Sequence, residues 1–227
     1  MRAQRGPEVG WDGPIFINPG GKCAAASVLQ AVYATRAGRT AIAACPELCA
    51  LAVEAERKSH AVDPTPLWGL IGLGDAQASA EEVLQLAAQR IGALGQALRV
   101  QTVTTTCCTG CGLVTEEAAP KYVLAVSVYR DSKPAAPRSL QLALREAEVS
   151  KGPDCLSCGA SRTAAEAVGG GQPPVLLAVA TNRAVHAPGE EGGCLLRWDI
   201  EISKEVIVAG DRYALRSVVV TKISTSP

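Results

Sequence analysis

Cys23 and a set of four paired cysteines in this 227-residue chain have sequence neighbours that suit cysteine chemistry. The first is Cys23, which follows a glycine-containing loop and comes directly before a segment at 24–34 with helical spacing of apolar residues. A thiol in the first turn of a helix lies at the positive end of the helix dipole, which favours the reactive thiolate. Position alone favours the ordinary alternative, a small buried side chain, because buried cysteines are common and usually inert.

The second group is a pair of C-x-x-C motifs, formed by Cys108 with Cys111 and by Cys155 with Cys158. A glycine follows each motif, and such turns aim two thiolates at one point. Two of them supply the tetrahedral four-sulfur shell that zinc prefers, so we predict a closed structural zinc site. A redox motif or plain core thiols are the alternatives, and the adjacent Cys107 could compete as a ligand.

Helices are expected in the first part of the chain. Beyond 24–34, the pattern predicts a break at 37–40, a helix from Pro46 to about Lys58 and an amphipathic helix through residue 98. That last helix begins with a capping box, Ser79 at the N-cap and Glu82 at N3. Near the start of the second helix, Cys45 and Cys49 are predicted to pack in the core.

Strands are expected after residue 100, where β-branched residues replace the helical pattern. The predicted strands are a β-branched run at 103–106 that leads into Cys108, then 122–129, a buried run at 175–180, an alternating segment around 198–202, 206–208 and 213–220. A helix is predicted at 139–149. This order of elements favours an α+β protein with a largely antiparallel sheet.

Composition narrows the classes of partner. The chain has 22 basic and 22 acidic residues, so no net charge favours nucleic acid or an anionic membrane. No secretory signal and no apolar run of membrane-spanning length are recognised. The odd count of nine cysteines, without a signal, indicates a reducing compartment, and we expect a cytoplasmic or nuclear protein.

Three stretches together resemble the ubiquitin-specific proteases, whose cysteine box reads G-L-x-N-x-G-N-T-C-Y-M-N-S-V-L-Q. Here residues 15–30 read I-F-I-N-P-G-G-K-C-A-A-A-S-V-L-Q, in which Asn18, Gly20, Cys23 and S-V-L-Q match in register. Residues 77–84, Q-A-S-A-E-E-V-L, resemble the Q-Q-D-A-H-E-F-L helix of the family. The paired C-x-x-C motifs correspond to its zinc-binding fingers. Later segments at 173–183 and 213–220 resemble two further strands of the family in the correct order.

The resemblance implies a papain-like cysteine protease fold with helical thumb, antiparallel-sheet palm and zinc-ribbon fingers. After an irregular arm at 1–14, one domain would span 15–227, with the thumb at 15–100, the fingers at 101–165 and the palm strands at 166–227. It implies a deubiquitinase in which Cys23 is the nucleophile and Asn18 an oxyanion-hole donor. Zinc would be held by the four paired cysteines, and the chain would act as a monomer on ubiquitin or ubiquitinated proteins.

The chain also departs from the family pattern. The catalytic histidine of the family follows the last matched strand, whereas this sequence has only His60 and His186, at neither family position. We therefore expect little or no isopeptidase activity from these 227 residues. The alternatives are a deubiquitinase that lacks its C-terminal end, a member that binds ubiquitin or a partner without cleaving it, and an unrelated zinc-ribbon interaction module with an inert Cys23.

Overall fold

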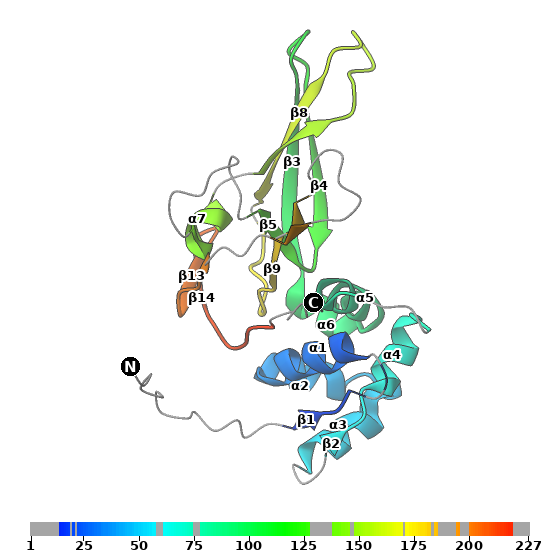
Figure 1. Ribbon diagram of the computed structural model, residues 1–227. Coiled ribbons are helices and arrows are strands. Elements are labelled where there is room, and N and C mark those ends of the chain that lie inside the picture. Colours follow the sequence, from blue (N-terminus) through cyan, green and yellow to red (C-terminus); the bar gives the residue numbers. More distant parts are fainter. Residues whose placement is uncertain are drawn as a thin grey trace. The chain divides into compact units, whose positions relative to one another are not determined.

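The computed structural model describes residues 14–18, 20, 22–57, 61–74, 78–127, 138–145, 148–169, 171–182, 184–185, 194–195 and 200–219. The chain divides into two compact units, residues 1–94 with 216–227, and residues 95–215. Among the described residues, helices make up most of the first unit and strands, largely antiparallel, most of the second (Figure 1). The expected mixed α+β class is therefore confirmed.

Short helices build the first unit. Their bounds are α1 (Cys23–Tyr33), α2 (Arg36–Ala43), the 3-10 turn η1 (Pro46–Leu48), α3 (Cys49–Glu56), α4 (Thr65–Ile71) and α5 (Ala80–Arg90), and α6 (Gly92–Leu98) leads into the second unit. Helix α5 packs against both α1 and α4, and apolar side chains such as Leu29, Leu67 and Val83 are fully buried. Strand β1 (Ile15–Phe16) lies parallel to β2 (Ala61–Val62) before the Cys23 loop.

Two predictions of helix bounds in this unit were wrong. The predicted break at 37–40 is helical, because the Thr35 hydroxyl accepts from the Gly38 amide and caps α2. The predicted helix at 79–98 is two helices, since Ile91 has extended backbone angles, φ −99° and ψ 93°. The capping box is confirmed at its first bond, the amide of Glu82 donating to Ser79 Oγ over 3.1 Å.

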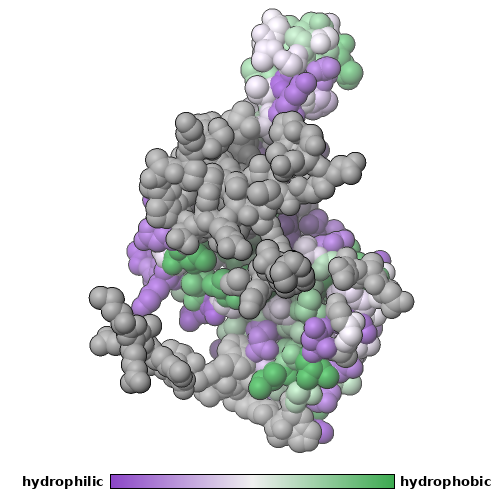
Figure 2. Space-filling model, in the orientation of Figure 1, coloured by the Kyte–Doolittle hydropathy of each residue, from purple (hydrophilic) through white to green (hydrophobic). Residues whose placement is uncertain are grey.

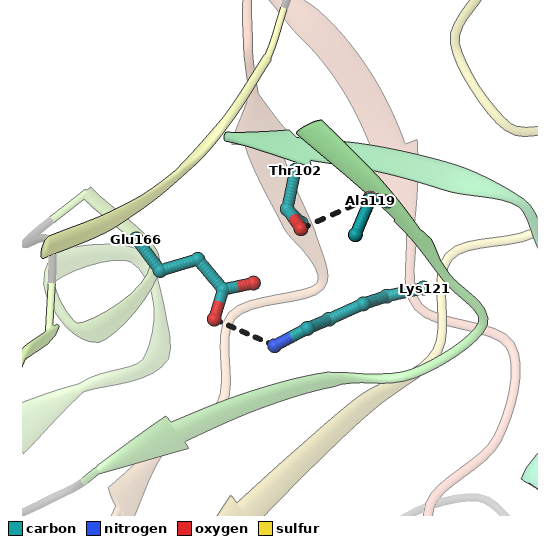
Figure 3. Close-up of polar contacts among 4 residues, drawn as sticks. All are labelled: Thr102, Ala119, Lys121 and Glu166. Atoms are coloured by element: carbon teal, nitrogen blue, oxygen red, sulfur yellow. Dashed lines mark hydrogen bonds and ion pairs between the residues drawn. The ribbon is translucent and has the colours of Figure 1, made fainter. Parts of the chain in front are cut away.

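A four-stranded antiparallel sheet of order β4-β3-β8-β7 dominates the second unit. Its strands are β3 (Val100–Cys108), β4 (Val114–Lys121), β7 (Glu148–Gly152) and β8 (Arg162–Val168), and Figure 1 shows β3, β4 and β8 extending side by side. Buried Thr102 donates to the Ala119 carbonyl at 3.2 Å, and Lys121 pairs with Glu166 at 2.6 Å across the central strand (Figure 3).

Smaller elements complete this unit. They are β5 (Leu124–Ser127) parallel to β9 (Val179–Asn182), β6 (Arg138–Ser139) parallel to β12 (Ile200–Glu201), β10 (Ala184–Val185) with β11 (Cys194–Leu195), the hairpin β13 (Glu205–Val208) and β14 (Asp211–Ala214), and α7 (Leu140–Arg145). One apolar cluster buries Val100, Leu124 and Val208, and a second buries Val126, Leu140 and Ala143.

Within the described residues no helix is both long and apolar enough to cross a membrane.

Predicted bounds in the second half were partly wrong. The run at 175–180 is not one buried strand, because Val175 is 71% exposed and the amide of Leu176 donates to the carbonyl of Ala97 before β9 begins. The helix expected at 139–149 ends at Arg145, and residues from 148 pair with β8 as β7. The strand expected at 213–220 ends at Ala214. Trp198, within the expected strand at 198–202, lies outside the described residues.

Candidate metal centre and candidate nucleophile

The antiparallel sheet brings the two C-x-x-C motifs to one end. Cys108 is the last residue of β3 and pairs in register with Arg162, the first residue of β8. The turns that follow β3 and precede β8 therefore lie side by side, although their cysteines are more than 40 positions apart. The four ligand atoms, Sγ of Cys108, Cys111, Cys155 and Cys158, all lie within 4.8 Å of one another. We call these two turns, residues 108–112 and 155–159, the knuckles.

Glycine closes both knuckles. Gly112 has φ +71° and Gly159 has φ +72°, a left-handed conformation that side chains disfavour. The amide of Gly112 donates to the carbonyl of Cys108, and the amide of Gly159 donates to that of Cys155. The glycine that follows each motif in the sequence is thus a requirement of the turn that points both sulfurs inward.

The knuckle backbone sets the charge of the sulfurs. The amide of Cys111, followed by that of Gly110, donates to Cys108 Sγ over 3.4 Å and lowers the pKa of this thiol to about 6. The Ala160 amide acts in the same direction on Cys158, but the neighbouring cysteine sulfurs and burial raise the pKa of Cys158 to about 11. The sulfurs of the two knuckles thus have different electrostatic surroundings.

The sulfur spacing fits a tetrahedral metal ion. Cys108 and Cys158 sulfurs are 3.5 Å apart, and Cys111 and Cys155 sulfurs are 3.8 Å apart. A regular tetrahedron with metal–sulfur bonds of ~2.3 Å has edges of ~3.8 Å. Within the described part of the chain, no other group of three or more potential ligands comes this close together. The four cysteines could therefore hold a metal ion.

Cys107 takes no part in this group. It is exposed, and as the neighbour of Cys108 on β3 it belongs to the opposite face of the strand. Its sulfur lies 3.9 Å from the carbonyl oxygen of Cys108, a contact with the backbone. The sequence alone left Cys107 as a competing ligand, and the alternation of the strand separates it from the cluster.

Cys23 is exposed and is the first residue of α1. The first bond of this helix runs from the Ala26 amide to the Lys22 carbonyl, and no side chain caps the helix. The amides of the first turn, that of Cys23 included, therefore have no partner within the helix. The ordinary alternative of a buried Cys23 side chain does not describe the structure. Asn18, the predicted oxyanion donor, is exposed, and Gly20 in the same loop has φ +63°.

Two side chains hold the segment that precedes Cys23, and the sequence analysis gave neither a role. Gln30 on α1 donates from Nε2 to the carbonyl of Pro14 over 2.8 Å and accepts from the amide of Phe16 at 3.4 Å. Lys22 Nζ donates to Thr65 Oγ1 at 3.4 Å, at the start of α4. Gln30 is the last residue of the S-V-L-Q match, so the sequence does contain a signal for its role.

A second cysteine has the same helical position as Cys23. Cys49 is exposed and is the first residue of α3, so its predicted core packing was wrong, whereas Cys45 is buried as predicted. The amide of Cys49 already donates to Pro46 within the preceding 3-10 turn. Position at a helix start therefore does not by itself distinguish Cys23. The loop with Asn18 and Gly20 does.

Several predicted positions lie outside the described residues: Pro19 and Gly21 of the loop, Gln77 of the second match, and both histidines, His60 and His186. Both imidazoles of the sequence therefore lie outside the part of the chain that the structure describes. Comparison with models of known protein families found no match for this chain. Comparison with curated proteins likewise found no similar one.

Proposed function

We propose that this chain is a ubiquitin-specific-protease-like protein in which Cys23 engages the C-terminus of ubiquitin. The observation that carries the proposal is the exposed Cys23 at the start of α1, a helix without a side-chain cap. Asn18 and Gly20 precede Cys23 in the glycine-containing loop, at the same spacing as in the family. The same register occurs in the cysteine box of that family. Cys49 has the exposure and the helix start without the loop, which makes the loop the distinguishing feature.

In this proposal the Cys23 thiolate attacks the carbonyl carbon of the C-terminal glycine of ubiquitin. Asn18 and the Cys23 amide donate to the oxyanion that develops, a role for which the loss of one donor typically costs ~100-fold or more in rate. A general base is needed to take the thiol proton and to return it to the leaving amine. No histidine of the sequence stands at the family position for this base, so turnover should be slow.

The architecture supports the same proposal at the level of the fold. In this proposal the helical unit would be the papain-like thumb, and the strands of the second unit would form the fingers and palm. The four clustered cysteines would be a structural zinc site in the fingers, closed because all four positions are sulfur. Zinc there would fasten together two turns that the sheet already brings side by side.

A ubiquitin molecule with a C-terminal electrophile tests the proposal. The 227-residue chain should form a one-to-one covalent adduct that Cys23→Ala abolishes, while a fluorogenic ubiquitin substrate is hydrolysed slowly or not at all. Adduct formation at another cysteine, or none with the correctly folded chain, would contradict it. Probes built on other ubiquitin-like modifiers serve as the specificity control.

A zinc-ribbon interaction module is the second candidate, because the metal cluster requires no residue of the Cys23 loop. Under this alternative the chain binds zinc and the ubiquitin electrophile does not react with it. Tight binding of unmodified ubiquitin without an adduct would instead indicate a non-cleaving member of the family.

A further inference from the structure

Within the metal cluster, two short sulfur contacts each join an exposed cysteine to a buried one. Cys158 is exposed and its sulfur lies 3.5 Å from that of buried Cys108. Cys111 is exposed and its sulfur lies 3.8 Å from that of buried Cys155. Both contacts run between the knuckles. Reagents in solvent can therefore approach one cysteine of each pair, and the other cysteine is buried.

We propose that Cys111 and Cys158 are sites of oxidation by hydroperoxides, and that the oxidised cluster carries the disulfides Cys108–Cys158 and Cys111–Cys155. This inference rests on the proposed zinc site and adds a reaction to it. Zinc keeps its cysteine ligands deprotonated, and the thiolate is the form that hydroperoxides attack. The product is a knuckle pair without metal, held by two cross-links in its place.

The reaction is balanced for each pair. The exposed thiolate, Cys158 or Cys111, attacks the outer oxygen of a hydroperoxide, the O–O bond breaks, and a sulfenic acid forms as an alkoxide or hydroxide leaves. The buried thiolate, Cys108 or Cys155, then attacks the sulfenic sulfur. The S–S bond forms and hydroxide leaves, taking a proton to become water. One hydroperoxide is reduced per disulfide, and Zn²⁺ is released when its ligands are consumed.

The fold favours these two pairings. A disulfide needs sulfurs ~2.05 Å apart, so the pairs at 3.5 Å and 3.8 Å must close by about 1.5 Å and 1.8 Å. The first knuckle is also joined, without the metal, to the residues that follow the second, because Thr109 donates from its amide at 3.1 Å and from Oγ1 at 2.8 Å to the carbonyl of Ser161. Loss of zinc therefore leaves the paired sulfurs facing one another.

Apolar side chains within or next to both knuckles are exposed to solvent. Leu156 between the second pair is completely exposed, and Leu113 and Val114 beside the first are 44% and 54% exposed. In Figure 2 the end of the long strands, at the top of the view, shows apolar and polar surface side by side. A small oxidant such as hydrogen peroxide can approach Cys111 and Cys158, because both residues are exposed.

The test uses the full chain purified with zinc and treated with two equivalents of hydrogen peroxide. A chromogenic chelator follows zinc release, and tryptic digestion after alkylation maps the disulfides. Cleavage after Arg99, Lys121, Lys151 and Arg162 gives peptides 100–121 and 152–162, one for each knuckle. Cross-knuckle disulfides join these peptides, and fragmentation within each motif identifies the partners. Cys107→Ser removes the neighbouring thiol and should change neither readout.

The expected result is stoichiometric zinc release with Cys108–Cys158 and Cys111–Cys155 as the products, both reversed by dithiothreitol and added zinc. Disulfides confined within each C-x-x-C motif, the pairings Cys108–Cys155 and Cys111–Cys158, or retained zinc would overturn the inference while leaving the zinc site intact. A correctly folded chain that carries no zinc before treatment would overturn the zinc site as well.

Discussion

Among single residues, the cysteines differ by what surrounds each sulfur rather than by their spacing alone. Cys108 Sγ accepts hydrogen bonds from two knuckle amides. Cys45 is buried instead, and its Sγ donates to the carboxylate of Glu47 over 3.2 Å. Burial, followed by this hydrogen bond, raises the pKa of Cys45. The first arrangement stabilises a thiolate and suits a metal ligand. The second keeps a neutral thiol in the core of the helical unit. The residue type therefore indicates a possible site, and the groups around each sulfur determine its chemistry.

Removal of one knuckle ligand should release the metal. Cys155→Ser leaves three sulfurs and a weakly coordinating hydroxyl, so we expect the zinc content to fall from about one per chain to near zero. Cys107→Ser is the control, because Cys107 is an exposed cysteine of β3 next to the cluster, and this variant should keep its zinc. Metal analysis of the purified variants measures both. Equal zinc in the two variants would contradict the assignment of the cluster.

At the level of elements, two glutamines protect the free edges of short strands. Gln30 of α1 bonds to Pro14 and Phe16 beside β1, and Gln141 of α7 bonds to both backbone groups of Ile207 in β13, at 2.7 Å and 2.9 Å. Each amide replaces a neighbouring strand, which leaves no open edge at that position. Only Gln30 supports the segment that leads to Asn18 and Cys23.

This difference gives a paired prediction. Gln30→Ala and Gln141→Ala should each lower the free energy of unfolding by roughly 1–3 kcal/mol, because each removes two hydrogen bonds of about 1 kcal/mol. Gln30→Ala should also slow labelling of Cys23 by the ubiquitin probe by about 10-fold or more, since a displaced loop misplaces the reacting groups. Equal labelling rates for the two variants would show that Gln30 has no positioning role.

The junction of α1 and α2 depends on a glycine. A Cβ at Gly38 would lie 2.2 Å from the carbonyl oxygen of Val32 and 2.6 Å from its Cγ1, so Gly38→Ala should destabilise the helical unit by about 1–3 kcal/mol or more. Gly69 in α4 has nothing within 4 Å of the same position. Gly69→Ala should therefore be neutral or stabilise by up to ~1 kcal/mol. Thermal unfolding of both variants checks this, and a stable Gly38→Ala would contradict the close approach.

Much of the element pattern could be predicted from sequence where the signal is local. The Ser79 cap and the α1 helix follow from short-range chemistry, and both are present. The break predicted around Gly38 was wrong because that glycine serves the close approach of the Val32 backbone, a tertiary requirement invisible in a local pattern. Strand bounds failed for the same reason, since β7 exists through its pairing with β8.

The candidate site was predictable to different depths. The C-x-x-C spacing predicted which four sulfurs would meet, because a turn of fixed geometry carries each pair. The exclusion of Cys107 needed the register of β3, and the roles of Gln30 and Lys22 needed the packing of α1 and α4. The position of a general base for Cys23 requires contacts between distant segments, which local patterns do not supply.

At the level of the whole molecule, each of the two units buries apolar side chains of its own. The helical unit buries residues such as Leu29 and Ile42, and the strand-rich unit buries clusters around Val100 and Val126. The metal cluster belongs to the second unit, and Cys23 belongs to the first. The folding energy of one unit should therefore depend little on the chemistry of the other.

Removal of the metal tests this separation. A zinc chelator should raise amide hydrogen exchange at the knuckles and the adjoining ends of β3 and β8, because the metal no longer fastens them. Exchange in α1 and α5 should remain unchanged, and so should the rate at which Cys23 reacts with a small alkylating agent. Faster exchange throughout the helical unit would show that the metal supports the entire chain.

The most direct test of the central claim compares two reagents on the same protein. Iodoacetamide should alkylate both Cys23 and Cys49, since both are exposed at the first residue of a helix. Ubiquitin with a C-terminal electrophile should modify Cys23 alone, because only Cys23 has the loop with Asn18 and Gly20. Peptide mapping after each reaction gives the two patterns. Modification of Cys23 and Cys49 by ubiquitin in the same ratio as by iodoacetamide would contradict a ubiquitin-directed nucleophile.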